Sequence, residues 1–318
     1  MESEKMKILN PLVTVNILSY NRKDELRHTL TKVFEQDYKN IEVIVVDNAS
    51  IDGTQEMINN QFPEVRLIQL SKNIGIAGWN KGFEIAKGEY VLVLDDDSYP
   101  DVTTTFFGVV FLEQNLNYGI VTFKIINNRI NEIETRSYKV ENPYLFHGCG
   151  SLIRTNVIKQ IGGFDPDYFL YYNEMDLTIR CYQEKIKIKY LSEREVYHQS
   201  EELETNYEKN KYHLHKTKYE QFFKGHIRFL VKHFELKYVI FYGSKWIFNR
   251  FIIASFFNYF SSFIKVILEL PMVISSAFKS RQKVDKVIQH YYNNGNQALI
   301  DRDFFPNYEK IKQKIIGE

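Results

Sequence analysis

The sequence lacks the two glycine-rich loops by which many α/β proteins hold nucleotides. The turn after the first expected strand reads SYNRKDE (residues 19–25) and contains no glycine, so the GxGxxG fingerprint fails at its required position. A phosphate-binding loop of the form GxxxxGK(S/T) is absent from the whole chain. Neither loop is therefore available to bind a nucleotide.

Cysteine, charge of one sign and long apolar runs are also scarce. Cys149 and Cys181 are too few for a disulfide framework and form no CxxC pair, which favours a reducing, cytoplasmic compartment. Lys and Arg number 41 against 40 Asp and Glu, so bulk charge indicates no nucleic-acid partner. The polar first ten residues do not resemble a signal peptide. The longest uncharged apolar stretch, residues 251–264, is too short to span a bilayer, so we expect no spanning segment.

The first hundred residues alternate short β-branched runs with amphipathic segments. This order predicts right-handed βαβ units and a mostly parallel sheet flanked by helices, an α/β fold. The expected strands are 12–20, 41–48, 65–70 and 89–94, and the expected helices are 23–36, 52–61 and 77–87. Farther along, the pattern predicts helices over 101–115 and 173–185, with strands over 119–126, 147–154, 186–191 and 194–199.

Three carboxylates, Asp95 to Asp97, directly follow the fourth expected strand. On extended chain the side chains at i and i+2 point the same way, so Asp95 and Asp97 can share a divalent cation bound to a nucleotide diphosphate. Asp96 would then face a ribose or a backbone amide. A bound cation relieves the mutual repulsion of the three charges. The alternative is a solvated acidic turn before the next helix.

Polar residues also follow the first two expected strands, at the sheet edge where α/β proteins bind ligands. Tyr20 is placed to stack on a base and Arg22 to lie near phosphate. Asp47 and Asn48 can accept hydrogen bonds from a pyrimidine N–H or a ribose hydroxyl. Ordinary helix entry and turn chemistry explain the same residues without a ligand.

Three glycines surround the start of the expected helix at 77–87, in the stretch NIGIAGWNKG (residues 73–82). Residues without a side chain let the backbone approach a flat ligand closely. Asn73 and Gly78 are candidates for this contact because they belong to the same sheet end. A glycine-rich loop alone is weak evidence for a site.

Together these stretches resemble the inverting, family 2 type of nucleotide-sugar glycosyltransferases. The resemblance covers about residues 12–200 and rests on VTVNILSYNR, VIVVDNASIDGT, NIGIAGWNKG, VLVLDDDS, GGFDPDYFLYYNEMDLTIR and YHQS, in this order. It implies a GT-A fold in a catalytic domain over 1–205. Within it, about 12–100 would bind the nucleotide and about 101–205 the acceptor. A helical, basic and aromatic-rich region would follow over 206–318.

The resemblance also implies roles for individual residues. Glu174 would be the general base that deprotonates the acceptor hydroxyl, with Asp176 supporting the site. Asn173 occupies a slot that is usually acidic in the family. His198 would complete the metal shell with Asp95 and Asp97, and a shell of carboxylates and imidazole suits Mn²⁺ better than Mg²⁺. The alternative for Glu174 and Asp176 is favourable charge in the first turn of a helix.

Residues 209–278 differ in composition from the rest of the chain. Lys and Arg number 10 against 2 Glu over 209–250, and the aromatic-rich segment 246–278 follows. In one continuous helix over 246–278 a polar face would gather Arg250, Asn258, Ser262, Lys265 and Glu269. Such a helix favours peripheral contact with the inner face of the plasma membrane. The alternatives are a cap docked on the catalytic domain and a homodimer interface.

The sequence therefore predicts a metal-dependent glycosyltransferase of cell-surface polysaccharide synthesis. A nucleoside-diphosphate sugar would be the donor, and a hydroxyl of a glycan or lipid-linked glycan would be the acceptor. One rival is a sugar-phosphate nucleotidylyltransferase, which needs a glycine-rich turn that residues 19–25 lack. The other rival is a non-catalytic scaffold with the same fold.

Overall fold

The structure is a computed structural model that describes residues 10–134, 143, 145–199, 216–256 and 258–294. It divides into two compact units, residues 1–225 and 226–318. The domain boundary predicted at residue 205 lies outside the described residues and stays a prediction.

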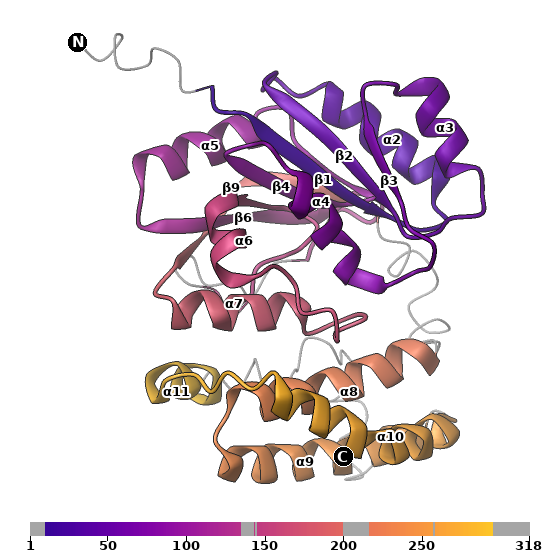
Figure 1. Cartoon of the computed structure of the whole chain (residues 1–318), viewed down its shortest axis with the longest axis vertical. Helices are drawn as coiled ribbons and strands as arrows, with labels where there is room; N and C mark the ends of the chain where they lie inside the picture. The colour runs from indigo at the N-terminus through magenta and orange to yellow at the C-terminus, as the bar shows by residue number, and fades with distance from the viewer. Residues whose placement is uncertain (1–9, 135–142, 144, 200–215, 257, 295–318) are drawn as a thin grey trace. The chain divides into compact units, whose positions relative to one another are not determined.

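In the part of the chain that the structure describes, one sheet of nine strands forms the centre of the first unit, in the order β3-β2-β1-β4-β8-β6-β9-β5, with β7 paired to β6 (Figure 1). Its strands are β1 (Val13–Ser19), β2 (Ile41–Asp47), β3 (Arg66–Gln69), β4 (Tyr90–Asp95), β5 (Ser98–Pro100), β6 (Tyr118–Asn127), β7 (Glu132–Ile133), β8 (Ser151–Arg154) and β9 (Lys187–His198). The strands β1 to β4 are parallel, and β8 enters antiparallel between β4 and β6. The predicted α/β fold class is confirmed.

Helices cover both faces of this sheet because its central strands are apolar on both sides. Buried residues of α2 (Lys23–Phe34), α3 (Thr54–Gln61) and α5 (Thr104–Gln114) pack on one face. Those of α4 (Trp79–Ile85), α6 (Thr155–Ile161) and α7 (Asn173–Gln183) pack on the other. Alternation along β2 illustrates the division, since Val45 faces the first layer and Ile44 the second.

Two local predictions in the first unit were wrong. The two short strands expected over 186–191 and 194–199 are the single strand β9, whose register against β6 shifts twice along its length. The helix expected from residue 77 begins as the short 3-10 helix η1 (Gly75–Gly78) and continues as α4. Both differences are irregularities of backbone geometry that side-chain periodicity does not record.

The described residues of the second unit are helical. The helix α8 (Lys216–His233) ends in it and is followed by α9 (Leu236–Phe256), α10 (Phe260–Lys279) and α11 (Lys286–Asn294). The prediction of one continuous helix over 246–278 was wrong. The helical conformation is interrupted between α9 and α10, where Asn258 has a left-handed φ of 59°. The predicted polar face was also wrong: Arg250 and Ser262 are buried at 1% and 2% exposure.

Helix α10 is the one described helix that is long and apolar enough to cross a membrane. The sequence predicted no such segment, because the uncharged stretch 251–264 lies between Arg250 and Lys265 and is too short to span a bilayer. Length and composition alone are weak evidence, since the core helix of a soluble protein meets the same criterion. Only 28% of its apolar window is buried, however.

Candidate functional site

The carboxyl ends of three neighbouring parallel strands meet at one edge of the sheet. Pairing of β1 with β2 sets Ser19 beside Asp47, and pairing of β1 with β4 sets Leu18 beside Asp95. The segments that leave these strands therefore start side by side. This edge is where open α/β sheets bind ligands.

The acidic trio lies against the segment that leaves β1. The backbone N–H of Tyr20 donates to Oδ2 of Asp96 at 3.1 Å, while the Tyr20 residue is 46% exposed. The Arg22 guanidinium donates to Asp97 and lies 3.7 Å from an oxygen of Asp96. Two of the three carboxylates are thus partly neutralised by Arg22, the residue that the sequence assigned to phosphate.

Burial and mutual repulsion oppose ionisation of the acidic trio. Burial, then the charge of Asp97, raise the pKa of Asp95 to about 7 and that of Asp96 to about 8. Asp97 behaves in the opposite way: burial would raise its pKa, but hydrogen bonding and charge from His198, then Arg22, lower it below the ordinary value. A divalent cation is the kind of partner that would let all three carboxylates ionise together.

His198, at the end of β9, joins this cluster across the sheet. Its Nε2 lies 3.2 Å from Oδ1 of Asp97, and its Nδ1 lies 2.9 Å from Oε2 of Glu134. Burial would lower the pKa of His198, but the hydrogen bonds to these two carboxylates raise it to about 11. Sequence analysis missed Glu134, because nothing in the residues around it marks a contact with a histidine 64 positions away.

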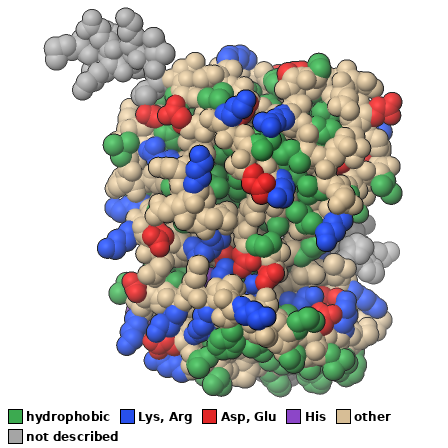
Figure 2. Space-filling view, viewed as in Figure 1, with side chains coloured by type: hydrophobic (Ala, Val, Ile, Leu, Met, Phe, Trp, Pro, Cys, Tyr) green, Lys and Arg blue, Asp and Glu red, His purple; other side chains and the backbone are tan. Residues whose placement is uncertain are grey.

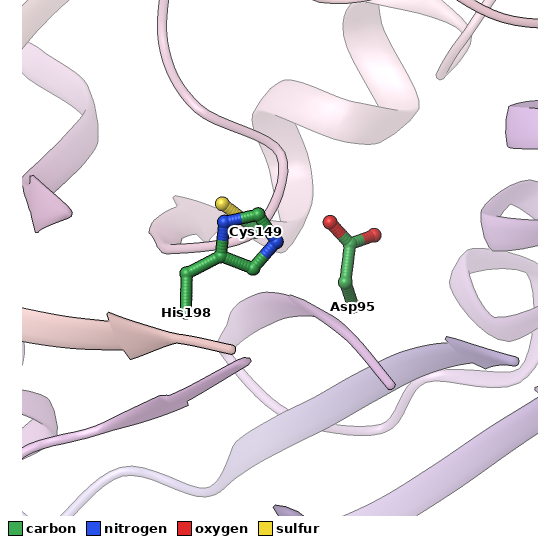
Figure 3. Close-up of side chains that lie close together, drawn as sticks. All are labelled: Asp95, Cys149 and His198. Atoms are coloured by element: carbon green, nitrogen blue, oxygen red, sulfur yellow. The ribbon is translucent and has the colours of Figure 1, made fainter. Parts of the chain in front are cut away.

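Asp95, Cys149 and His198 form a group suited to a metal ion (Figure 3). One ligand atom from each lies within 4.8 Å of the others. Burial raises the pKa of the Cys149 thiol well above its ordinary value, which disfavours the thiolate that binds metals. The oxygen and nitrogen donors of Asp95, Asp97 and His198 fit a hard or borderline divalent cation.

The other residues predicted to bind the nucleotide, Asp47, Asn73 and Gly78, make local contacts that stabilise the backbone at this sheet edge. The Asp47 carboxylate is fully buried and accepts from the Ser50 N–H at 3.1 Å and from Gln55 Nε2 at 2.6 Å. Asn73 accepts from the Gly75 N–H at 2.8 Å. A Cβ at Gly78 would lie 2.4 Å from the Leu18 side chain. We therefore see local structural roles for these three residues.

Asn48 connects the loop of residues 73–78 to the end of β2. Its Oδ1 accepts from the Ile74 N–H at 3.2 Å, and its Nδ2 donates to the Gly75 carbonyl at 3.0 Å. Asn48 is 3% exposed. Its amide therefore closes the loop instead of facing a ligand.

Glu174 lies in the first turn of α7 and faces the same site. Tyr171 and Tyr172, directly before the helix, both have left-handed φ values, 67° and 61°. Such strain in residues with side chains is typical of functional sites. A Cβ at Gly148 would lie 3.1 Å from Oε1 of Glu174, a tight contact that the glycine avoids. The charge of Glu174 contributes to the raised pKa of Asp95, which places the two carboxylates in one electrostatic environment.

Burial raises the pKa of Glu174 above its ordinary value. Hydrogen bonds that include one from the backbone of Gly148 act in the other direction. A carboxylate whose pKa is moved toward neutrality is suited to accept a proton at physiological pH.

Asp176 does not face the cluster. It is completely buried, and Arg180 donates to it from both Nε and Nη2 at 2.8 Å. Arg180 also donates to the carbonyl of Gly163 at 2.7 Å and to that of Ile161. The ion pair of Asp176 and Arg180 therefore connects α7 to the end of α6, and the role of Asp176 is to stabilise the fold.

Comparison with known proteins gives a family match over part of the chain. Residues 14–168 match the family described as Glycosyl transferase family 2. One relative is the UDP-Glc:alpha-D-GlcNAc-diphosphoundecaprenol beta-1,3-glucosyltransferase WfaP of Escherichia coli, 38% identical over 46% of this chain and 62% of that protein. Another is the amylovoran biosynthesis glycosyltransferase AmsB of Erwinia amylovora, 29% identical over 56% of this chain and 65% of that protein. The matched regions thus span under two thirds of these relatives.

Solved structures show the same fold at low sequence identity. The mannosyltransferase PcManGT from Pyrobaculum calidifontis, in complex with GDP-Man and Mn²⁺, superimposes with a TM-score of 0.56 at 16% identity, over 96% of this chain and 85% of that one. TarS of S. aureus gives a TM-score of 0.55 at 19% identity, over 69% of this chain and 39% of that one. Residues 14–168, just under half of the chain, are therefore similar to glycosyl transferase family 2, and the chain has the GT-A fold of these solved structures.

Proposed function

We propose that the protein is an inverting, metal-dependent glycosyltransferase. It moves one sugar from a nucleoside-diphosphate donor to a hydroxyl of a glycan or lipid-linked glycan in cell-surface polysaccharide synthesis. The observation that carries the proposal is the meeting of Asp95, Asp97 and His198 with Glu174 at one edge of the sheet. The names of the relatives WfaP and AmsB support a polysaccharide product.

The chain's residues would divide the work of a single displacement. Glu174 accepts the proton of the acceptor hydroxyl as that oxygen bonds to the anomeric carbon of the donor. The bond from this carbon to the diphosphate oxygen breaks, and the electron pair leaves with the diphosphate. Attack from the face opposite the leaving group inverts the anomeric configuration.

Asp95, Asp97 and His198 would hold Mn²⁺ or Mg²⁺. The cation supplies Lewis-acid neutralisation of the departing diphosphate. Arg22, whose side chain is 41% exposed, is placed to turn from Asp97 to a phosphate oxygen once the carboxylates have a cation. The Tyr20 ring, which is half exposed, stacks on the nucleoside base.

A thermal-shift panel of nucleotide sugars, each with and without Mn²⁺, tests the proposal. A donor that binds the native protein raises its melting temperature by mass action, by an amount that grows with donor concentration. We expect one UDP-, dTDP- or GDP-sugar to stabilise the protein, and to do so more strongly with Mn²⁺. Absence of any stabilisation across the panel would count against the proposal and leave the scaffold alternative.

We also propose that the second unit attaches the protein to the inner face of the plasma membrane. Six large apolar side chains on α9 and α10 are at least 56% exposed and define the α9–α10 face (Figure 2): Ile240, Phe241, Phe248, Phe256, Leu268 and Met272. A patch of this kind is typical of an interaction site. Between Leu236 and Lys279 the chain has exposed Lys237, Lys245, Lys265 and Lys279 and the single acid Glu269.

Apolar side chains among lysines complement an anionic bilayer surface better than they complement a second copy of the same positively charged face. Sedimentation with vesicles of phosphatidylcholine, with or without phosphatidylglycerol, tests this. We expect binding that requires phosphatidylglycerol and is lost in Phe248→Ser together with Leu268→Ser. Leu116→Ser, an 80% exposed leucine of the first unit, is the matched control. Equal vesicle binding by all variants, or loss of a dimer on mutation instead, would overturn the membrane assignment.

A further inference from the structure

Glu134 contacts the histidine of the cluster and has no role in the proposed reaction so far. It follows β7 in the hairpin that pairs with β6, and its backbone N–H donates to the Ile125 carbonyl at 2.9 Å. Its Oε2 lies 2.9 Å from Nδ1 of His198, while its Oε1 accepts from Nδ2 of Asn127 at 3.1 Å. Both carboxylate oxygens therefore have defined partners.

Strand pairing fixes this arrangement. Asn127 is directly opposite His198 in the parallel pairing of β6 with β9, and it is completely buried. The backbone N–H of Asn128 donates to the His198 carbonyl at 3.2 Å. The end of β6 thus holds both the histidine backbone and the carboxylate that contacts its ring.

We propose that Glu134 is a positioning residue that orients His198 for cation binding. A carboxylate at Nδ1 accepts the N–H of that nitrogen, so Nε2, on the Asp97 side of the ring, is the nitrogen that would give up its proton and bind the cation. Carboxylates that contact a metal-binding histidine in this way fix the tautomer and the ring orientation, and their loss typically weakens metal affinity 10- to 100-fold. The inference rests on the proposed function, because it assigns His198 to the cation.

The contact differs from a surface ion pair in what it constrains. The Glu134 and His198 side chains are only 20% and 18% exposed, and the ring is held at both nitrogens by carboxylates of different elements. Removal of Glu134 leaves the Asp97 side of the ring intact but frees rotation about the Cβ–Cγ bond. The expected effect is therefore on cation affinity more than on folding.

Manganese binding to the full chain, measured by electron paramagnetic resonance of free Mn²⁺, tests the proposal. We expect Glu134→Ala to raise the Mn²⁺ dissociation constant about 10- to 100-fold. Glu134→Gln keeps an oxygen that can accept the Nδ1 proton and is expected to lose less. Glu132→Gln, an exposed glutamate of the same hairpin, is the matched control and should bind as the native protein does.

A second readout follows the ring itself. In protein labelled with ¹⁵N-histidine and saturated with diamagnetic Mg²⁺, we expect His198 as the Nδ1–H tautomer, and a mixture of tautomers in Glu134→Ala. Native Mn²⁺ affinity and an unchanged ring signal in Glu134→Ala would overturn the inference. A failure of the proposed function can be told apart from a failure of this inference. In the first case the panel of nucleotide sugars would show no stabilisation, whatever the order of Mn²⁺ affinities among these variants.

Discussion

Replacement of Glu174 by glutamine is the sharpest perturbation of the proposed chemistry. Gln is nearly the same size, so it fits the space beside Gly148, but it cannot accept a proton from the acceptor. General base catalysis contributes typically 10²- to 10⁴-fold. At about 1.36 kcal/mol per tenfold change, this predicts a rise of about 2.7 to 5.4 kcal/mol in the activation free energy.

The structure predicts a second, opposite effect of the same substitution. The charge of Glu174 contributes to the raised pKa of Asp95. Removal of that charge lowers the pKa of Asp95, so the carboxylate ionises more readily and Mn²⁺ should bind as tightly as before or more tightly. Loss of turnover with retained Mn²⁺ and donor affinity separates a missing base from a damaged site.

The assay is initial-rate transfer to an acceptor, with hydrolysis of the donor identified in the thermal-shift panel as a substitute readout. Mn²⁺ affinity and melting temperature of the variant are measured in parallel. A Glu174→Gln protein with turnover within tenfold of the native rate would refute the assignment of the base. Equal background rates in both proteins would instead favour the non-catalytic scaffold.

Three further predictions concern stability. Asp176→Asn leaves the buried Arg180 guanidinium without its carboxylate and should lower the unfolding free energy by about 3 to 5 kcal/mol. Urea titration measures this loss, and Mn²⁺ affinity should not fall selectively. An unchanged urea midpoint would contradict the structural role of Asp176. Gly82→Ala places a Cβ 2.0 Å from the amide oxygen of the buried Asn16, and a destabilised protein is expected by calorimetry, whereas native stability would show that Asn16 can move. The pKa of Asp96 is raised from 3.8 to about 8, so the folded metal-free protein binds this proton more tightly than the unfolded chain does. The unfolding free energy should therefore fall as pH rises from about 4 to about 8. Asp96→Asn should flatten this slope, and a slope equal to that of the native protein would refute it.

The strand ends of the first unit could be predicted because their signals are local. Each of β1, β2 and β4 is a short β-branched run that stops at a polar residue, and parallel strands bring such stops to one edge. Parallel pairing accordingly brings Asp95 beside Leu18, at the end of β1. The family resemblance supplied His198, which the chain pattern alone did not mark.

Other features depend on contacts that a single sequence does not record. The residues Glu174 and Asp176 occupy the same helical turn and carry the same charge, yet one faces the cluster and the other binds Arg180 in the interior. The link between Glu134 and His198 follows from hairpin geometry. In the second unit, apolar periodicity predicted one helix, but the left-handed backbone at Asn258 divides it, and Arg250 is buried.

The claim on which the account depends is that the acidic trio holds a divalent cation together with a diphosphate. A crystal grown with Mn²⁺ and a nucleoside diphosphate, and examined by anomalous diffraction at the manganese edge, tests it directly. We predict one manganese peak within bonding distance of Asp95 or Asp97 and of His198 Nε2, with phosphate oxygens on its open side. A nucleotide bound elsewhere, or ordered carboxylates with no manganese between them, would contradict the account.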